Sequence, residues 1–318
     1  MKKQPWIAVV TFILMGHLSA NPTGGQAISG DLTFHFHGKT LEIRASDQSI
    51  VHWDDFSIDA GELTRFVQPS ASATVLNKVL GLNPSLINGA LEANGKVILI
   101  NPQGVIVGKG GIIRTADFIA STLDRISTTA EGMEFTGDST ASIVNYGTIK
   151  TEFGDVVLIA TTVNNSGSVE APLGKVLIGA GSNVLLSPVT EERIFIRPSL
   201  SSGSIENNGV LSAAEVVLKT EGSAYALAIN AGGFIQATDV VESNGKIFLV
   251  AEGGLLTVNG NLESPKGTVE LRGDKVLIGG TANIDVSSDN GGGTVLIGTH
   301  HLKNDPSNVY SDMIYLDP

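Results

Sequence analysis

Short apolar runs recur along the chain, and most are four or five residues long. Runs of this length that are rich in Val and Ile favour buried strands over helices. Val156–Ala160 is followed 20 residues later by Val176–Ala180, and Val276–Gly280 is followed 19 residues later by Val295–Thr299. No stretch shows the 3.6-residue period of an amphipathic helix. The pattern therefore predicts an all-β chain built from repeats.

A second series of segments begins with Asn and has the same spacing. Asn145 and Asn165 are 20 residues apart, and each is followed closely by Gly. A fixed period near 20 indicates a solenoid, and helical repeats need roughly 33 residues or more. The consensus of leucine-rich repeats is absent. A coil of this length holds three short strands with turns, so we predict a parallel β-helix whose coils stack about 4.8 Å apart.

A solenoid of this kind leads to expectations about its turns, its outer surface and its first coil. Asn at the turns tolerates left-handed backbone and can form local hydrogen bonds. Runs such as Val156–Ala160 are apolar at every position, so we expect another element to cover their outer side. An uncovered first coil would expose unpaired strand edges. Residues 21–75, whose pattern differs from the repeats, are expected to form the N-terminal cap.

Composition and charge exclude several classes of function. Gly accounts for 38 of the 318 residues, whereas aromatic residues make up only 5%, which suits tight turns around a narrow aliphatic column. The formal net charge of −12 argues against nucleic acid as a partner, because phosphate backbones select basic surfaces. The chain has no Cys, which excludes disulfides, thiolate nucleophiles and Cys-based metal sites. This absence also suits a chain that crosses an oxidising compartment unfolded.

Residues 1–20 have the pattern of a secretory signal peptide. Lys2 and Lys3 form a basic start, an apolar run extends from Trp6 to Leu18, and a small residue, Ala20, precedes the expected cleavage point. No other stretch approaches 18 uninterrupted apolar residues. We therefore predict a secreted or surface-exposed protein.

One turn is singled out by its chemistry. Asn101, Pro102, Gln103 and Gly104 separate two β-branched runs, of which the first is Val97–Ile100. Pro fixes φ and removes a donor, and Gly104 can supply a positive φ. The simplest interpretation is an ordinary hairpin turn.

Several segments in order resemble a known family. They are Asn21–Gly25 (NPTGG), Val51–Phe66 (VHWDDFSIDAGELTRF), Val67–Pro84 (VQPSASATVLNKVLGLNP), Asn94–Gly108 (NGKVILINPQGVIVG) and Phe118–Asp124 (FIASTLD). On these segments the chain resembles the secretion domain of filamentous haemagglutinin-like exoproteins of the two-partner secretion pathway, and within them the high-molecular-weight adhesin branch. The later repeats resemble the haemagglutinin-type shaft.

The resemblance implies a right-handed parallel β-helix with an N-terminal β cap and extra-helical hairpins. It implies three parts: a signal peptide (1–20), a cap and secretion-domain core (21–125) and β-helix repeats (126–318). The implied partner is an outer-membrane barrel with periplasmic POTRA domains, and a receptor on a host or neighbouring cell is a further expected partner. The implied role is that of an exported adhesin without enzymatic activity or cofactor.

The resemblance also marks site residues. In the family an Asn-Pro-Asn-Gly turn is tied to secretion, and here it falls on Asn101, Pro102, Gln103 and Gly104, with Gln103 in place of the second Asn. Asn83 and Pro84 resemble a second family motif more loosely. The sequence leaves open whether Asn101–Gly104 contacts the transporter or only holds the first coils in shape.

Candidate metal and catalytic sites are weaker. His35 and His37 share one face of a strand but lack a third ligand. His52 with Asp54 and Asp55 has no Ser in a strained turn to complete a triad. The other candidates are a chelating His300–His301 pair, a calcium turn at Asp285, Asp289 and Gly291–Gly293, and the acid pairs Glu131/Glu134 and Glu191/Glu192. We expect no metal site, and a polysaccharide lyase or hydrolase on the same scaffold is the alternative function.

Overall fold

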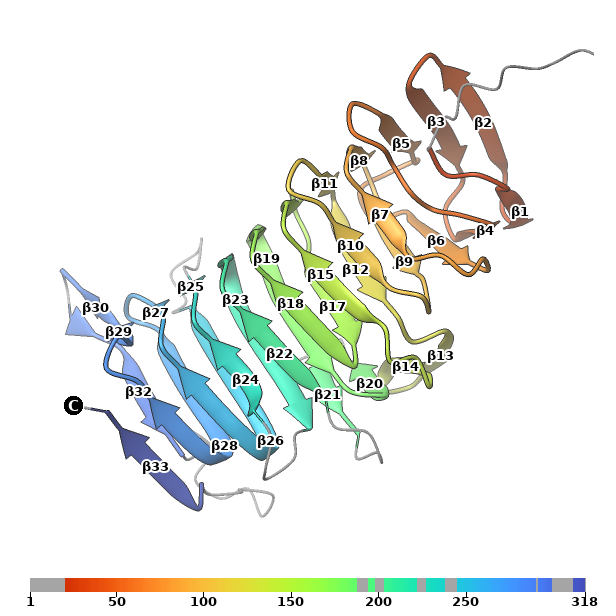
Figure 1. Cartoon of the computed structure of the whole chain (residues 1–318). Coiled ribbons are helices and arrows are strands. Elements are labelled where there is room, and N and C mark those ends of the chain that lie inside the picture. Colours follow the sequence, from red (N-terminus) through yellow and green to blue (C-terminus); the bar gives the residue numbers. More distant parts are fainter. Residues whose placement is uncertain are drawn as a thin grey trace, which may run out of the picture.

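The computed structural model describes residues 21–187, 194–197, 203–221, 227–237, 245–289, 291–298 and 311–317. The predicted signal peptide (1–20), Glu191/Glu192 and His300–His301 lie outside the described residues. The described chain is all β, in parallel coils that stack into one elongated right-handed β-helix (Figure 1). None of the described residues forms a helix long and apolar enough to cross a membrane.

From residue 85 onward each coil contributes one strand to each of three faces, and the strands of one face pair in parallel from coil to coil. The first face consists of β4 (Ser49–Trp53), β6 (Thr74–Val79), β9 (Lys96–Ile100), β12 (Asp117–Ser121), β17 (Val156–Ala160), the second half of β19 (Ser168–Ala180) and of β23 (Val210–Glu221), the first half of β26 (Lys246–Val258) and of β28 (Thr268–Ile278), and β32 (Thr294–Ile297).

The second and third faces continue the same coils. The second face consists of β7 (Ser85–Ile87), β10 (Val105–Val107), β15 (Ser142–Asn145), β18 (Thr162–Asn165), β22 (Ser204–Asn207), β24 (Leu227–Ala231), the later halves of β26 and β28, and β33 (Met313–Leu316). The third face consists of β3 (Thr40–Ala45), β5 (Leu63–Val67), β8 (Ala90–Ala93), β11 (Ile112–Thr115), β16 (Thr148–Thr151), the first halves of β19 and β23, β25 (Phe234–Ala237), β27 (Asn261–Glu263) and β29 (Asn283–Asp285).

The cap is shorter than the sequence predicts. Among the described strands, only β1 (Gln26–Ser29) and β2 (Leu32–His37) pair antiparallel with strands of the coils, namely β4 and β3. Parallel stacking already begins at β3, so the expectation of a cap over residues 21–75 is wrong in extent. The first coils are filled by aromatic rings, with Trp53 packed edge-on against Phe34 and Phe56, and therefore lack the aliphatic runs that mark later coils.

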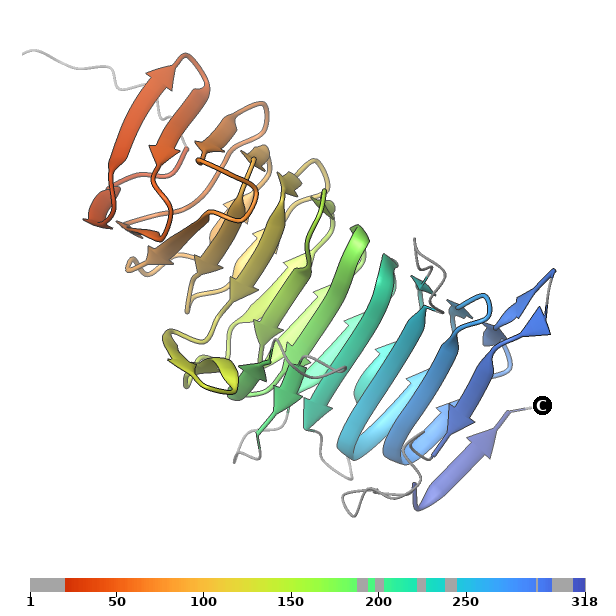
Figure 2. The ribbon, with the colours of Figure 1, turned by 180° about the vertical axis from the view of Figure 1, so that it is seen from behind.

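Two separate cores run along the solenoid. The inner column is mainly Val, Ile, Leu and Ala, as predicted. An outer core covers the first face, where β13 (Arg125–Thr129), β14 (Gly132–Thr136), β20 (Asn183–Leu186) and β21 (Ile194–Ile196) form an antiparallel sheet. Figure 2 shows this small sheet lying against the side of the stack. The prediction that an element covers the outer side of Val156–Ala160 is confirmed, and so are the extra-helical hairpins. A further short hairpin joins β30 (Ser287–Ser288) and β31 (Gly291–Gly292).

The turn asparagines act differently from the expectation. Asn145, Asn165 and Asn207 end consecutive strands of the second face and are buried. Among the described non-glycine residues only Gln48 and Lys266 have positive φ, so the left-handed interpretation of these Asn residues is wrong. Their predicted local hydrogen bonding is confirmed, since Asn145 Oδ1 accepts from the Gly147 amide at 3.1 Å.

Candidate secretion-motif site

Asn101 follows β9 and begins the corner that leads from the first face to β10 on the second. Its side chain is fully buried. The amide Nδ2 donates to the Asn83 carbonyl and to Ser85 Oγ, both at 3.0 Å, and Oδ1 accepts from the Gln103 amide at 2.9 Å. The Asn101 side chain therefore closes its own turn and ties it to the preceding coil.

The strands on either side of this corner do not pair with each other. β9 lies between β6 and β12, whereas β10 lies between β7 and β15. The hairpin interpretation of Asn101–Gly104 is therefore wrong, and the turn is a corner of one coil. The backbone of Gly104 has φ +115°, as the sequence anticipated, and its amide donates to the Asn101 carbonyl at 3.0 Å.

The departure from the family pattern at Gln103 leaves the corner intact. Gln103 is exposed, and the corner uses only its backbone amide. Pro102 contributes its carbonyl, which accepts from Ser139 Oγ of the next coil at 2.6 Å. Side chains of Asn101 and Ser139, rather than of Gln103, thus connect three successive coils.

The structure brings the two sequence motifs together. Asn83 and Pro84 occupy the corner directly before that of Asn101, one coil earlier, where the Asn83 carbonyl receives the Asn101 amide and the Ser85 amide donates to the Gly104 carbonyl at 3.0 Å. Sequence reasoning missed Ser85 and Ser139. Ser85 could have been found because it directly follows Asn83-Pro84, but nothing local marks Ser139.

A polar cavity of about 420 Å³ opens beside the corner, at the base of the β13–β14 hairpin. Its lining residues are Pro102, Gln103, Asp124, Arg125, Asp138, Ser139, Thr140 and Ala141. The lining offers hydrogen-bond donors and acceptors but contains no His or Cys. Across the described part of the chain, no group of three or more His, Cys, Asp or Glu side chains is placed to hold a metal ion.

The weaker candidates are placed in structural or exposed positions. His35 and His37 stack with ring centroids 6.4 Å apart on exposed β2. Asp285 accepts from the Ser287 hydroxyl at 2.6 Å and from its amide at 2.8 Å, and these bonds lower the pKa of the carboxyl group while fixing a turn. Glu131 and Glu134 both lie beside the Arg197 guanidinium, with N–O distances of 2.7 and 3.6 Å.

The chain is similar to several known proteins. A family model, the TPS secretion domain, matches residues 37–271. Two heme/hemopexin-binding proteins of Haemophilus influenzae are 30% and 29% identical over 247 and 248 residues, covering 73% and 69% of this chain and 27% of theirs. The chain thus corresponds to about a quarter of the length of these relatives.

Solved structures agree with the family match. The HMW1 secretion domain from Haemophilus influenzae superposes with a TM-score of 0.79 at 28% identity, covering 94% of this chain and 82% of that one. The filamentous hemagglutinin secretion domain, at 18% identity and a TM-score of 0.53, covers 88% and 100% and shares the fold. Because the family model alone spans well over half of the chain, this protein belongs to the TPS secretion domain family of two-partner secretion exoproteins.

Proposed function

We propose that residues 21–125 direct export of this exoprotein and that residues 126–318 begin its extended shaft. Membership of the TPS family implies an outer-membrane transporter as the partner. On this proposal the transporter's POTRA domains receive the chain in the periplasm, and the product is released or displayed at the cell surface. The observation that carries the proposal is the family match together with the Asn101 corner, where both family-like motifs meet.

The proposed mechanism couples export to folding. The chain crosses the periplasm unfolded, which its lack of Cys permits, and folds outside from the cap onward. Within the three faces each coil pairs with its neighbours, so folding propagates one coil at a time and opposes sliding back through the pore. The Asn101 corner supports this order because its bonds join early coils, from that of Asn83 to that of Ser139.

The exported protein is proposed to act as an adhesin with a surface receptor. The relatives named heme/hemopexin-binding proteins favour a second candidate, capture of heme or hemopexin. Binding of the secreted product to host cells, compared with binding to immobilised hemopexin, separates the two. Neither of these relatives carries the name of an enzyme, so they lend no support to the polysaccharide-active alternative. Turnover of a polysaccharide by the purified chain would revive it.

The export proposal is tested by expressing the chain with its transporter and measuring the secreted and cell-retained fractions. We expect Asn101→Ala to reduce secretion at least tenfold without lowering synthesis, because three buried hydrogen bonds at the corner are lost. Gln103→Ala is the matched control in the same turn and should be exported normally, since the Gln103 side chain is exposed. Normal export of Asn101→Ala would remove the motif from the mechanism, and export without any transporter would refute the proposal.

A second measurement separates recognition from folding. If Asn101 acts through the folded corner, the unfolded Asn101→Ala chain should still bind the isolated POTRA domains as tightly as the parent chain. Its secreted fraction should then be protease-sensitive. Loss of POTRA binding by the unfolded variant would instead show that the transporter reads the Asn101 side chain directly.

A further inference from the structure

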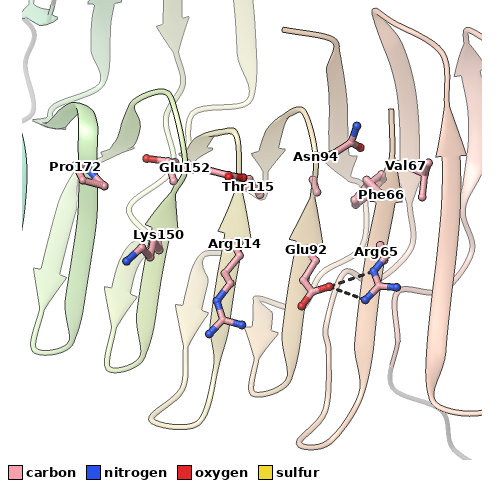
Figure 3. Close-up of a pocket in the computed structure, with 12 residues that line it drawn as sticks. Arg65, Phe66, Val67, Glu92, Asn94, Arg114, Thr115, Lys150, Glu152 and Pro172 are labelled. Carbon is pink, nitrogen blue, oxygen red and sulfur yellow. Dashed lines mark hydrogen bonds and ion pairs between the residues drawn. The ribbon is translucent and has the colours of Figure 1, made fainter. Parts of the chain in front are cut away.

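A groove of about 770 Å³ runs along the third face, across successive coils rather than along one strand. Figure 3 shows two rows of side chains, with Arg65, Glu92, Arg114 and Lys150 in one row and the strand ends in the other. The strand-end row includes Asn94, Thr115, Glu152 and Pro172. The groove therefore offers a surface that repeats once per coil.

Charge along the first row is unevenly compensated. Arg65 donates to Glu92 through Nη2 at 2.8 Å and Nε at 3.1 Å. Lys150 pairs with Glu170 at 2.8 Å, and this hydrogen bond lowers the pKa of Glu170. Arg114 stands in register between Glu92 and Lys150 and makes no hydrogen bond or ion pair with the described residues. Glu92 is turned toward Arg65 (Figure 3).

Arg114 has an opposite charge, Glu92, in register on one side and a like charge, Lys150, on the other, and like charges directly opposite each other in a sheet repel. The chain is acidic overall, with a net charge of −12, so its composition does not explain why positively charged side chains lie together in this groove. An anionic ligand lying in the groove would relieve the repulsion. Arg is suited to this role since its guanidinium binds a carboxylate through two parallel hydrogen bonds.

We propose that this groove binds an acidic linear polysaccharide, with a sugar carboxylate at Arg114 and the next acidic residue near Lys150. The coils are stacked about 4.8 Å apart, close to the length of one sugar unit in an extended 1,4-linked chain. At the groove edge, the carboxylate of Glu152 supplies acceptors for sugar hydroxyls. The proposal does not depend on the export mechanism.

The strand pairing disfavours an extended peptide as the occupant. A peptide that adds a strand needs an open sheet edge. Here β8, β11 and β16 are each paired on both sides, so none has a free edge within the groove. The groove also crosses the strands, and Arg114 and Lys150 lie in register in adjacent coils, so a ligand that contacts both must present acidic groups about one coil apart.

The test measures binding of 1,4-linked oligogalacturonate to the purified chain by calorimetry. We expect binding that weakens with added salt, because the contacting charges are exposed. Arg114→Gln should weaken binding about tenfold, as expected for loss of one charge-assisted contact. Arg125→Gln removes one positive charge from the β13–β14 hairpin, outside the groove, and should leave the affinity unchanged.

Three outcomes would overturn the proposal: no binding of oligogalacturonate, equal binding of a neutral oligosaccharide of the same length, or tighter binding of a poly-Glu peptide. A folding defect is distinguished by thermal unfolding. Arg114 has no hydrogen-bond or ion-pair partner among the described residues and lies between one opposite and one like charge, so Arg114→Gln should melt at about the same temperature as the parent chain. A structural role would be assigned instead if Arg114→Gln both lost binding and melted at a lower temperature, whereas Arg114→Lys did neither.

Discussion

At the scale of single residues, buried amide side chains connect the coils where the chain turns. Asn145 Nδ2 donates to Asn165 Oδ1 at 2.8 Å, and Asn165 Nδ2 donates to Asn207 Oδ1 at 2.7 Å. A primary amide carries both a donor and an acceptor, so one residue type can repeat along the axis and satisfy its neighbour each time. The Asn101 corner uses the same chemistry, but its Nδ2 donates to the Asn83 backbone carbonyl and the Ser85 hydroxyl instead of to another Asn side chain.

Replacing the middle member of this ladder should be costly. Asn165→Ala leaves the Asn207 amide oxygen without its donor and takes the acceptor from Asn145, at buried positions. We expect a loss of about 1–3 kcal/mol in the free energy of unfolding, measured by urea denaturation. Asn164→Ala is the matched control, since Asn164 precedes it on the same strand and points outward. Equal stability of the two variants would contradict a structural role for the ladder.

At the scale of elements, the outer sheet buries the outward-facing apolar side chains of the first face and so forms a second core. The runs on the first face are apolar at every position, and their outward side chains, such as Val157 and Ile159, pack under β14, β20 and β21. The need for a cover could be predicted from these runs alone. Its identity could not, because the two hairpins are inserted in different coils and pair only through the contact of β14 with β20.

Phe135 is the aromatic residue that the outer sheet contributes to this second core, and it is fully buried. Phe135→Ala should lower the free energy of unfolding by about 3–5 kcal/mol, because burial is lost and a cavity remains. Hydrogen exchange should show faster opening of β13, β14 and β20, while β16 on the opposite third face stays protected. Phe153→Ala, which truncates a ring that is 56% exposed, is the control and should have little effect. Uniform loss of protection over all three faces would show that the two cores unfold as one.

At the scale of the whole molecule, the repeat period predicts that the coils stack. It does not predict which residues form the contacts between neighbouring coils. The 20-residue step between Val156 and Val176 becomes direct register in the first face. The contact between Asn83 and Asn101 depends on the length of the intervening coil, whose 18-residue separation differs from the 20-residue step of the later repeats. The early coils were missed for a related reason: Trp53, Phe56 and Phe66 fill them with rings, so their strands lack the Val and Ile runs of later coils.

Apart from the pairing of β14 with β20 in the outer sheet, each coil contacts its neighbours, so damage in the middle of the solenoid should stay local in its effect. Ile205 is buried in the inner column, between Val163 and Ile229 of adjacent coils. Ile205→Asp places an unpaired carboxylate there, at a cost of several kcal/mol. The coils before it retain their own contacts, so we expect denaturation in two steps instead of one.

Trp53 makes this expectation measurable. It is buried in the first coils, and its Nε1 donates to Asn77 Oδ1 at 2.9 Å, so its fluorescence reports the N-terminal end of the stack. In a chain that starts at Asn21 it is the single tryptophan, because the other one is Trp6. In Ile205→Asp the circular dichroism signal should begin to fall at lower urea than Trp53 fluorescence, whereas outward-facing Glu206→Gln should give the parent curve. Coincident transitions for Ile205→Asp would mean that the solenoid unfolds as one unit, and folding from the cap during export would then lose its physical basis.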